Sequence, residues 1–581
     1  MPSAFQRYLP FAASTTPTQA ATYLLGISLF SISFLVFLNS SVSFVITDLI
    51  GQKKNVGDVV GTLGFADEIV ALVACPAWGL VSDRLGVRWV AAIGYLIVGM
   101  SLVVFVQARN VYPQLLLARI LFALGASATA TMVTAILPSL TDEDEELRNS
   151  ALERARAARD SRSNARLSAA YSVESEATIT PEMYSRSLSS EGRPVSASVD
   201  PQGRSGKSSV LAGYVGLFTG CGALLALSCF LPLPAKFGEI DNVTPGEAVS
   251  YSYYVVGAVA LLVAVFVFFG LRNIQGEEGK GWRLLLGFKG PSSDGYAYSG
   301  RTQNKVIPYL HLMMDSILLG FTDSRIALGY LGGFVARAST VAISLFVPLY
   351  INTFFIGNGF CQGSPNDPSP ELKKECRQAY VLSSILTGVA QLMGLLCAPV
   401  FGYLSRHPGR VNYPVVAATV FGIVGYAIFP RLPSPEIGDV DGRGGSPAVF
   451  LVVTLLGISQ IGSIVCSLGS LGKGILAVEI PRNARRQHFL APDEDESGES
   501  EPLIRIATEE EFVSRLRLKG SIAGVYSLCG GAAILLLTKL GGLLFDKVST
   551  GTPFYMMAGF NAVLLLATLF VDASQTFSSR R

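Results

Sequence analysis

The sequence predicts an all-α membrane protein whose 12 transmembrane helices form two pseudo-symmetric six-helix halves. Three observations lead to this prediction: an apolar composition, a series of long apolar segments, and an internal repeat. Half of the 581 residues are hydrophobic and only 15% are charged. A soluble protein would carry roughly a quarter charged residues, so this chain needs lipid to cover its apolar surface. The lipid bilayer is therefore its first expected partner.

Twelve segments are each long enough to cross a bilayer as a helix. A hydrocarbon core about 30 Å thick needs about 20 mostly apolar residues. The first of them follows a polar stretch without a compact apolar core, so we expect no cleaved signal peptide. The segments lie near residues 22–46, 59–81, 89–107, 113–137, 209–233, 251–271, 326–350, 378–404, 413–430, 447–471, 519–544 and 552–572.

Three long polar segments separate these spans, at 141–208, 272–325 and 473–518. The first is rich in Ser, Arg and Glu, a composition typical of disorder. With 12 spans, all three fall on the same side as both chain ends, 1–20 and 573–581. Most Lys and Arg residues lie on that side, although long loops count for little in such a comparison. We therefore expect the chain ends and the three segments to be cytoplasmic.

The chain repeats itself between its predicted halves, 21–271 and 326–572. A stretch of span 5, residues 212–217, is similar to residues 523–528 of span 11. Two related six-helix halves are typical of transporters that move about a central site. At the end of the second span of each half, four residues recur at a constant offset: Pro76, Gly79, Ser82 and Gly86 correspond to Pro399, Gly402, Ser405 and Gly409.

The residues that follow span 2 resemble the signature G-x-L-a-D-r-x-G-r-k of the major facilitator superfamily. Gly79, Asp83, Arg84, Gly86 and Arg88 match it. The resemblance implies the 12-helix fold, transport by alternating access, and a motif that holds the cytoplasmic side closed. Gly79 allows close helix packing, Gly86 allows a tight turn, and Asp83 can pair with basic residues or face a helix N-terminus. The alternative is a loop ion pair that only fixes topology.

The second copy of this motif departs from the signature. Arg406 stands at the position that corresponds to Asp83. An arginine cannot replace the carboxylate in any of these contacts, so we expect a single strong gate.

Three charged residues lie inside the predicted spans of the first half. Asp67 and Glu68 are roughly 12–14 Å deep in span 2, and adjacent helical residues point about 100° apart, so we expect one of them to face the cavity. Arg119 of span 4 resembles the arginine of the family motif R-x-x-x-G, which is linked to proton movement, but Ala123 replaces the glycine. The alternatives are proton coupling, a structural ion pair, and an arginine that reaches to the interface.

Four further polar residues inside spans are candidates for the substrate cavity. In the family the first helices of each half line the cavity, which points to Asn39 and Arg337, with Gln391 and Gln460 beside them. Together they could bind an anionic or polar group. The alternative for Arg337 is that its side chain extends to the cytoplasmic interface. The sequence does not identify the substrate, which we expect to be a small organic solute.

Span 5 carries only half of the drug:proton antiporter motif G-x-x-x-G-P-x-x-G-G. Four glycines remain, but Cys221 replaces the proline and leucines replace the paired glycines. This departure weakens an antiporter assignment without excluding it.

The segment ESEPLI matches an acidic dileucine sorting signal, with Glu499 as the acid and Leu503 and Ile504 as the apolar pair. With the long polar segments, it makes the chain resemble fungal vacuolar facilitators of the drug:proton antiporter type. The resemblance implies a sorting adaptor as partner and a vacuolar, lysosome-like membrane, with the plasma membrane as the alternative. The signal could also be a chance match in an acidic run.

Cys361 and Cys376 lie in a polar loop on the predicted non-cytoplasmic side, where a disulfide can form. Two free thiols are the alternative. No cysteine or histidine spacing predicts a metal site, and none of the three histidines lies in a span. We therefore expect no cofactor, no metal and no enzyme activity. The near-zero net charge gives no sign of a nucleic-acid partner.

These observations predict a monomeric secondary active transporter that works by alternating access, with protons as the candidate coupling ion. If a pH gradient does not alter its flux, a facilitator remains. The competing hypothesis is a receptor or scaffold that has kept the fold, does not transport, and signals through its cytoplasmic segments.

Overall fold

The structure is a computed structural model, and every regular element that it describes is a helix. The 12 helices long and apolar enough to span a membrane confirm the predicted number. The chain is thus an integral multi-pass membrane protein. The described residues are 10–12, 14–52, 56–141, 206–240, 243–274, 277, 280–285, 309–357, 377–406, 412–438, 444–476 and 518–580.

The first half contains six spans, several of them assembled from consecutive helices. Short π-helical turns join α2 to α3 and α10 to α11, so that each pair crosses the membrane as one unit. The helices are α2 (Pro17–Ala21), α3 (Phe30–Phe44), α4 (Val56–Leu85), α5 (Val87–Phe105), α6 (Leu116–Thr141), α10 (Gly206–Leu225), α11 (Leu233–Gly238) and α12 (Pro245–Gly270).

The second half repeats this plan. Its helices are α15 (Ser324–Val341), α16 (Val347–Gly357), α18 (Arg377–Leu404), α19 (Tyr413–Ile428), α20 (Ala448–Leu476), α22 (Lys519–Leu536), α23 (Gly542–Lys547) and α24 (Thr552–Arg580). Two helices lie between the halves, in a segment for which the sequence predicted only a loop: α13 (Trp282–Leu285) and α14 (Tyr309–Thr322).

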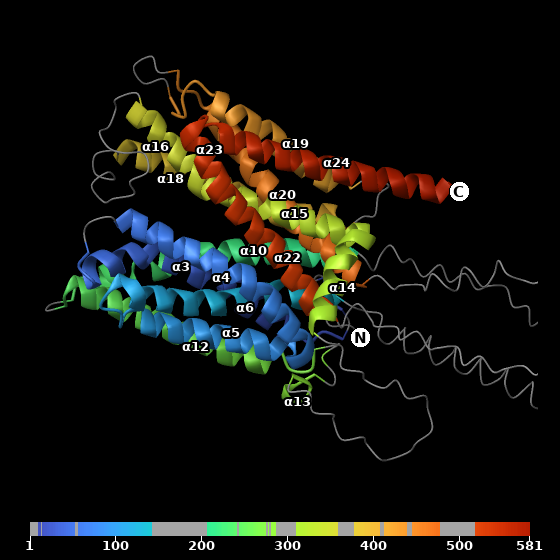
Figure 1. The fold of residues 1–581 in the computed structure, drawn as a ribbon, viewed down its shortest axis with the longest axis horizontal. Coiled ribbons are helices and arrows are strands. Elements are labelled where there is room, and N and C mark those ends of the chain that lie inside the picture. Colours follow the sequence, from blue (N-terminus) through green and yellow to red (C-terminus); the bar gives the residue numbers. More distant parts are fainter. Residues whose placement is uncertain are drawn as a thin grey trace, which may run out of the picture.

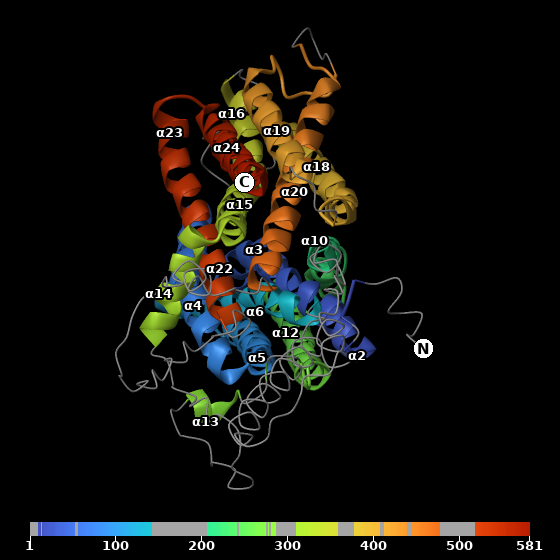
Figure 2. The ribbon, with the colours of Figure 1, turned by 90° about the vertical axis from the view of Figure 1, so that its right-hand side faces the viewer.

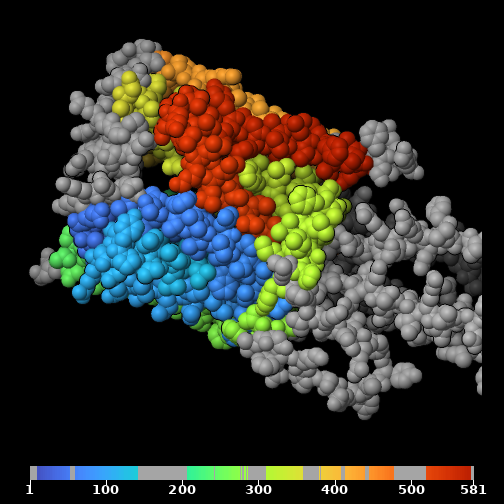
Figure 3. Space-filling model, viewed as in Figure 1, coloured from blue at the N-terminus to red at the C-terminus, as the bar shows by residue number. Residues whose placement is uncertain are grey.

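The two halves form separate bundles that meet at one end and part at the other (Figure 1). They converge where α4 ends and α22 begins, and we call this end the termini side, because the first span begins there and the last one ends there. At the opposite end, the far side, the space-filling view shows the halves separated (Figure 3). Seen from the termini side, α20 and α22 of the second half reach down onto the first half (Figure 2).

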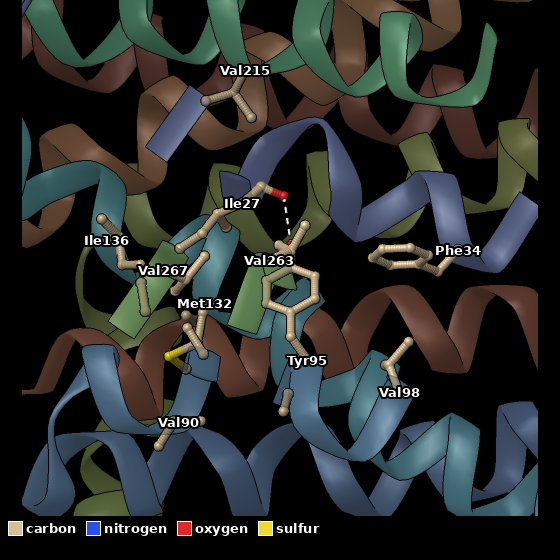
Figure 4. Close-up of a cluster of buried hydrophobic side chains, with 14 of the residues drawn as sticks. Ile27, Phe34, Val90, Tyr95, Val98, Met132, Ile136, Val215, Val263 and Val267 are labelled. Carbon is tan, nitrogen blue, oxygen red and sulfur yellow. Dashed lines mark hydrogen bonds between the residues drawn. The ribbon is translucent and has the colours of Figure 1, made fainter. Parts of the chain in front are cut away.

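One apolar core fills the first bundle and continues into the second, and a smaller core lies wholly within the second bundle. In the first half, Tyr95 of α5 is fully buried beside Phe34 and Met132 (Figure 4). Its hydroxyl donates to the backbone carbonyls of Gly26 and Ile27, at 3.1 and 3.0 Å. Because no water is available to a hydroxyl buried in a membrane bundle, these hydrogen bonds hold α5 against the first span.

Candidate functional site

Asp83, at the end of α4, contacts the first turn of α22 in the other half. Its carboxylate accepts hydrogen bonds from the backbone N–H groups of Gly520 at 2.8 Å and Ser521 at 2.7 Å, and from the Ser521 hydroxyl. The N-terminus of a helix carries unpaired N–H groups and partial positive charge, so it favours an anion. Of the two partners predicted for Asp83, the structure shows the helix N-terminus.

Gly79 lies where α4 and α22 cross, and a side chain would not fit there. A Cβ atom on Gly79 would be 2.4 Å from the carbonyl oxygen of Gly520 and 3.0 Å from the Cα of Gly524. Both obstacles are backbone atoms, which cannot rotate away. The motif glycine therefore allows the close approach that brings Asp83 within reach of α22.

The second crossing between the halves, of α10 with α18, repeats this geometry. A Cβ atom on Gly213 would be 2.9 Å from the Cα of Gly402. Gly402 corresponds to Gly79, and Gly213 corresponds to Gly524 in the sequence repeat. At the end of this crossing Arg406 lies against Gly206, the first residue of α10, with no carboxylate in the place of Asp83. The sequence repeat thus marks both crossings between the halves, but only the crossing of α4 with α22 has a carboxylate, that of Asp83.

A second contact across the termini side joins Lys519 to Glu277. The Lys519 side chain is fully buried, and its Nζ donates to Oε1 of Glu277 and to Oγ of Ser139, both at 2.7 Å. Oε2 of Glu277 accepts a bond of 2.6 Å from the backbone N–H of Val87. Glu277 therefore connects the start of α5 to the start of α22. We call Asp83, Glu277, Lys519 and Ser521 the termini-side gate.

Gly86 is needed for the Glu277 contact. Its φ of +101° is a conformation that side chains rarely adopt, and a Cβ there would be 2.6 Å from Oε2 of Glu277. Sequence analysis missed Glu277, because an acid in a polar segment gives no signal of burial. The glycine of the motif was the only hint that another group approaches this turn.

The arginines of the motif stack on aromatic rings. The guanidinium of Arg84 lies 3.5 Å from the ring centroid of Tyr309, at the start of α14. That of Arg88 lies 4.7 Å from the centroid of Phe268. Such contacts hold a cation by the electron density of the ring face. Both arginines therefore fix the motif against neighbouring helices.

We expect Glu277→Gln to destabilise the protein by about 3–5 kcal/mol, because Lys519 would stay buried without its counterion. Thermal unfolding of the purified protein measures this loss. Glu247→Gln is the matched control: Glu247 lies at the exposed start of α12, and glutamine can keep its capping bond. Equal unfolding temperatures for the two variants would contradict the buried ion pair.

The ion pair also predicts a pH dependence. Burial raises the pKa of Glu277, but the ammonium groups of Lys519 and Lys280 outweigh it and hold that pKa below its usual value. A carboxylate with a lowered pKa stabilises the fold above its unfolded pKa, and this stabilisation is lost as pH falls through the folded pKa. The difference in unfolding temperature between wild type and Glu277→Gln should stay constant down to about pH 5 and shrink below about pH 4. A difference that vanishes near neutral pH would contradict this assignment.

Three helices of the first half bring together Asn39, Asp67 and Arg119 within their spans, and we call these residues the polar centre. Nε of Arg119 donates to Oδ2 of Asp67 at 2.7 Å, and its Nη2 bonds to Oδ1 of Asn39. Arg119 is only 2% exposed. This burial contradicts the interpretation in which Arg119 extends to the membrane interface. Proton coupling and a structural ion pair remain as interpretations.

Two atoms of the polar centre have no hydrogen-bond partner among the described residues: Oδ1 of Asp67 and Nη1 of Arg119. Buried polar atoms are nearly always paired, so unpaired atoms in a site mark a place for a proton, a water or a ligand. The polar centre can therefore accept a further group.

Glu68, next to Asp67, is half-buried and has no hydrogen bond or ion pair among the described residues. Leu72, one turn after Glu68, packs on Gly531 of α22, and the stem of Arg337 packs on the adjacent Gly530. Asp67 thus pairs within its own half, whereas Glu68 lies on the part of α4 that meets the other half.

The second half has a neutral polar cluster. Nε2 of Gln460 donates to Oγ1 of Thr340 at 2.9 Å, and Nε2 of Gln391 lies 3.4 Å from Oε1 of Gln460. Like the polar centre, the cluster joins three helices of one half. The predicted cavity residues Gln391 and Gln460 therefore lie together, whereas Asn39 belongs to the polar centre.

The remaining predicted residues lie outside the described ones. These are Glu499, Leu503 and Ile504 of the sorting signal and Cys361 and Cys376 of the predicted disulfide. Within the described ranges, no group of three or more His, Cys, Asp or Glu side chains could hold a metal ion.

Comparisons with known proteins concern the family and the fold of this chain. A sequence model described as Major Facilitator Superfamily matches residues 29–154, which include the motif that begins at Gly79. No curated protein matches the chain.

Several solved structures share the fold. The transporter FucP in its outward conformation has 11% identity and a TM-score of 0.51, over 95% of this chain and 99% of that one. The proton:xylose symporter XylE bound to 6-bromo-6-deoxy-D-glucose has 12% identity and a TM-score of 0.50, over 94% of each chain. A variant of the E. coli fucose:proton symporter FucP has 12% identity and a TM-score of 0.50, over 95% and 99%. At these identities the likeness concerns the fold alone.

Proposed function

This chain has the fold of the major facilitator superfamily, and on that premise we propose that it is a secondary transporter that moves a small organic solute by alternating access. One observation carries the proposal. The halves are closed on the termini side by complementary groups, with Asp83 on the N-terminus of α22, and are parted on the far side. A closed gate at one end and an opening at the other is one of the two states that alternating access requires.

We further propose that Asp67 carries a proton. A proton that reaches the carboxylate of Asp67 neutralises it and leaves the guanidinium of Arg119 with an unbalanced positive charge. Oδ1 of Asp67 has no partner among the described residues and is the oxygen available to that proton. Arg119 would then keep its bond to Asn39 and become free to bind an anion. The proton would leave once the termini-side gate opens and water reaches the pair.

Flux measurements test transport directly. The full chain in proteoliposomes should carry a small organic solute faster than protein-free vesicles. A pH gradient should raise its accumulation, with the vesicle interior acidic for an antiporter and the exterior acidic for a symporter. A variant that lacks most of residues 142–205 should transport equally well, because the spans of both halves remain. If no solute crosses faster than in protein-free vesicles, the receptor or scaffold hypothesis takes its place.

We propose a vacuolar membrane as the location, on the strength of the Glu499, Leu503 and Ile504 signal. A Leu503→Ala/Ile504→Ala variant should then move to the plasma membrane. An unchanged location would remove the proposed adaptor contact. We also propose that the protein is an antiporter, which the direction of proton flux relative to solute flux tests. We propose that it is a monomer, which the mass of the purified protein tests.

A further inference from the structure

Two charged residues from different halves lie near the same stretch of α22, and no ion pair joins them. Glu68 belongs to α4 and Arg337 to α15. The stem of Arg337 packs on Gly530 of α22, and Leu72, one turn after Glu68 on α4, packs on the adjacent Gly531. Neither Glu68 nor Arg337 has a hydrogen bond or an ion pair within the part of the chain that the structure describes. Both side chains are partly exposed.

Such an arrangement needs a reason, because an ionisable group inside a membrane protein is costly unless it is paired or serves a function. The adjacent Asp67 and Arg119 neutralise each other. Glu68 and Arg337 have no such partner among the described residues; the first half contributes the negative charge and the second half the positive one.

The surroundings of Arg337 favour a bound anion. Its stem lies against Gly530, where a Cβ atom would be 2.7 Å from its Cγ, so a glycine makes room for it. Tyr526 lies against Gly333, one turn before Arg337 on α15, and its hydroxyl is hydrogen-bonded to that of Ser467 at 3.1 Å. Arg337 keeps donors for a partner that comes from outside the chain.

We propose that Glu68 and Arg337 bind the two charges of a zwitterionic substrate, with its ammonium at Glu68 and its carboxylate at Arg337. The inference rests on the proposed transport function and names its substrate class: α-amino acids and related compounds that carry both charges. Because the two residues belong to different halves, such a substrate would hold the halves together around itself. A compound with one charge would leave the other residue unpaired.

The test measures binding to the purified full chain by thermal unfolding. It uses matched series of three probes: phenylalanine, phenethylamine and 3-phenylpropionate, then leucine, isoamylamine and 4-methylpentanoate. A ligand that binds only the folded protein stabilises it by RT ln(1 + L/Kd), where L is the concentration of free ligand, and so raises the unfolding temperature. In at least one series the amino acid should raise it more than either single-charge analogue.

Two variants test which residue binds which charge of the substrate. Glu68→Gln should lose the preference for the amino acid and still bind the carboxylate analogue, whereas Arg337→Gln should still bind the amine. Arg431→Gln is the control, because Arg431 stacks on Tyr555 away from this pair and its removal should leave the preference unchanged. A preference that survives in both Glu68→Gln and Arg337→Gln would overturn the proposal.

The proposal is also overturned if no compound in either series shifts the unfolding temperature, or if a single-charge analogue shifts it as much as the amino acid. These outcomes are separable from a failure of transport. Flux of other solutes without a preference for zwitterions would reject this inference alone. Binding of zwitterions without flux would reject the transport function alone.

Discussion

The Asp67→Asn variant is expected to lose pH-driven accumulation of substrate while it continues to exchange substrate across the membrane. Asparagine has the shape of aspartate but cannot take up a proton, so the transport cycle is no longer tied to proton movement. A gradient of one pH unit supplies about 1.4 kcal/mol per proton, so accumulation should fall by about tenfold for each unit imposed. Uptake in proteoliposomes with and without a pH gradient measures both properties.

The structural interpretation of the pair makes a different prediction. Asp67→Asn leaves Arg119 buried without a counterion, which is expected to cost about 3–5 kcal/mol of stability. A double variant, Asp67→Asn with Arg119→Gln, removes both charges and should recover most of that stability. If the double variant also recovers pH-driven accumulation, the pair only holds the helices together and Asp67 carries no proton.

The Gly79→Ala variant is expected to open the termini-side gate. The added methyl group would meet the backbone of Gly520 at 2.4 Å only when α4 and α22 are packed together, so it destabilises the closed state alone. Overpacking of this kind costs about 1–3 kcal/mol, which shifts a two-state equilibrium by about 5- to 150-fold. Transport should slow, because the far-side-open state then becomes rare.

Accessibility of Ser82 reports this shift. Ser82 is fully buried beneath the gate. In a background without reactive cysteines, Ser82→Cys should react with a polar maleimide several-fold faster when it is combined with Gly79→Ala. Gly64→Ala is the matched control, since it adds the same methyl group to the same helix where no atom lies within 4 Å. Equal labelling rates of Ser82→Cys in the Gly79→Ala and Gly64→Ala variants would contradict a gate that depends on Gly79.

Much of the fold was predictable because the bilayer imposes simple rules. A span must be long, apolar and helical, so the twelve spans could be recognised from length and hydropathy alone. The structure extends most of them by a few residues and adds α14, whose 14 residues are too few to cross. The repeat placed Gly79 and Gly402 at equivalent positions, and both lie at crossings between the halves.

The candidate site was predictable only in its residue types. A charge inside a span is rare enough that Asp67, Glu68, Arg119 and Arg337 could be selected individually. Which of these residues pair with one another could not be predicted. The helical period gives the direction of a side chain relative to its own helix, but it does not say how that helix is rotated against its neighbours. Glu277 gave no signal at all, since an acid in a polar segment is ordinarily solvated.

The sequence by itself determined that this protein crosses the membrane twelve times in two related halves, because hydropathy and repetition are properties of the chain. Only the tertiary structure decided that Asp83 meets the N-terminus of α22, that Lys519 is buried against Glu277, and that Arg337 packs on Gly530 of α22. Each of these contacts joins residues far apart along the chain, and the packing of whole helices sets their distances.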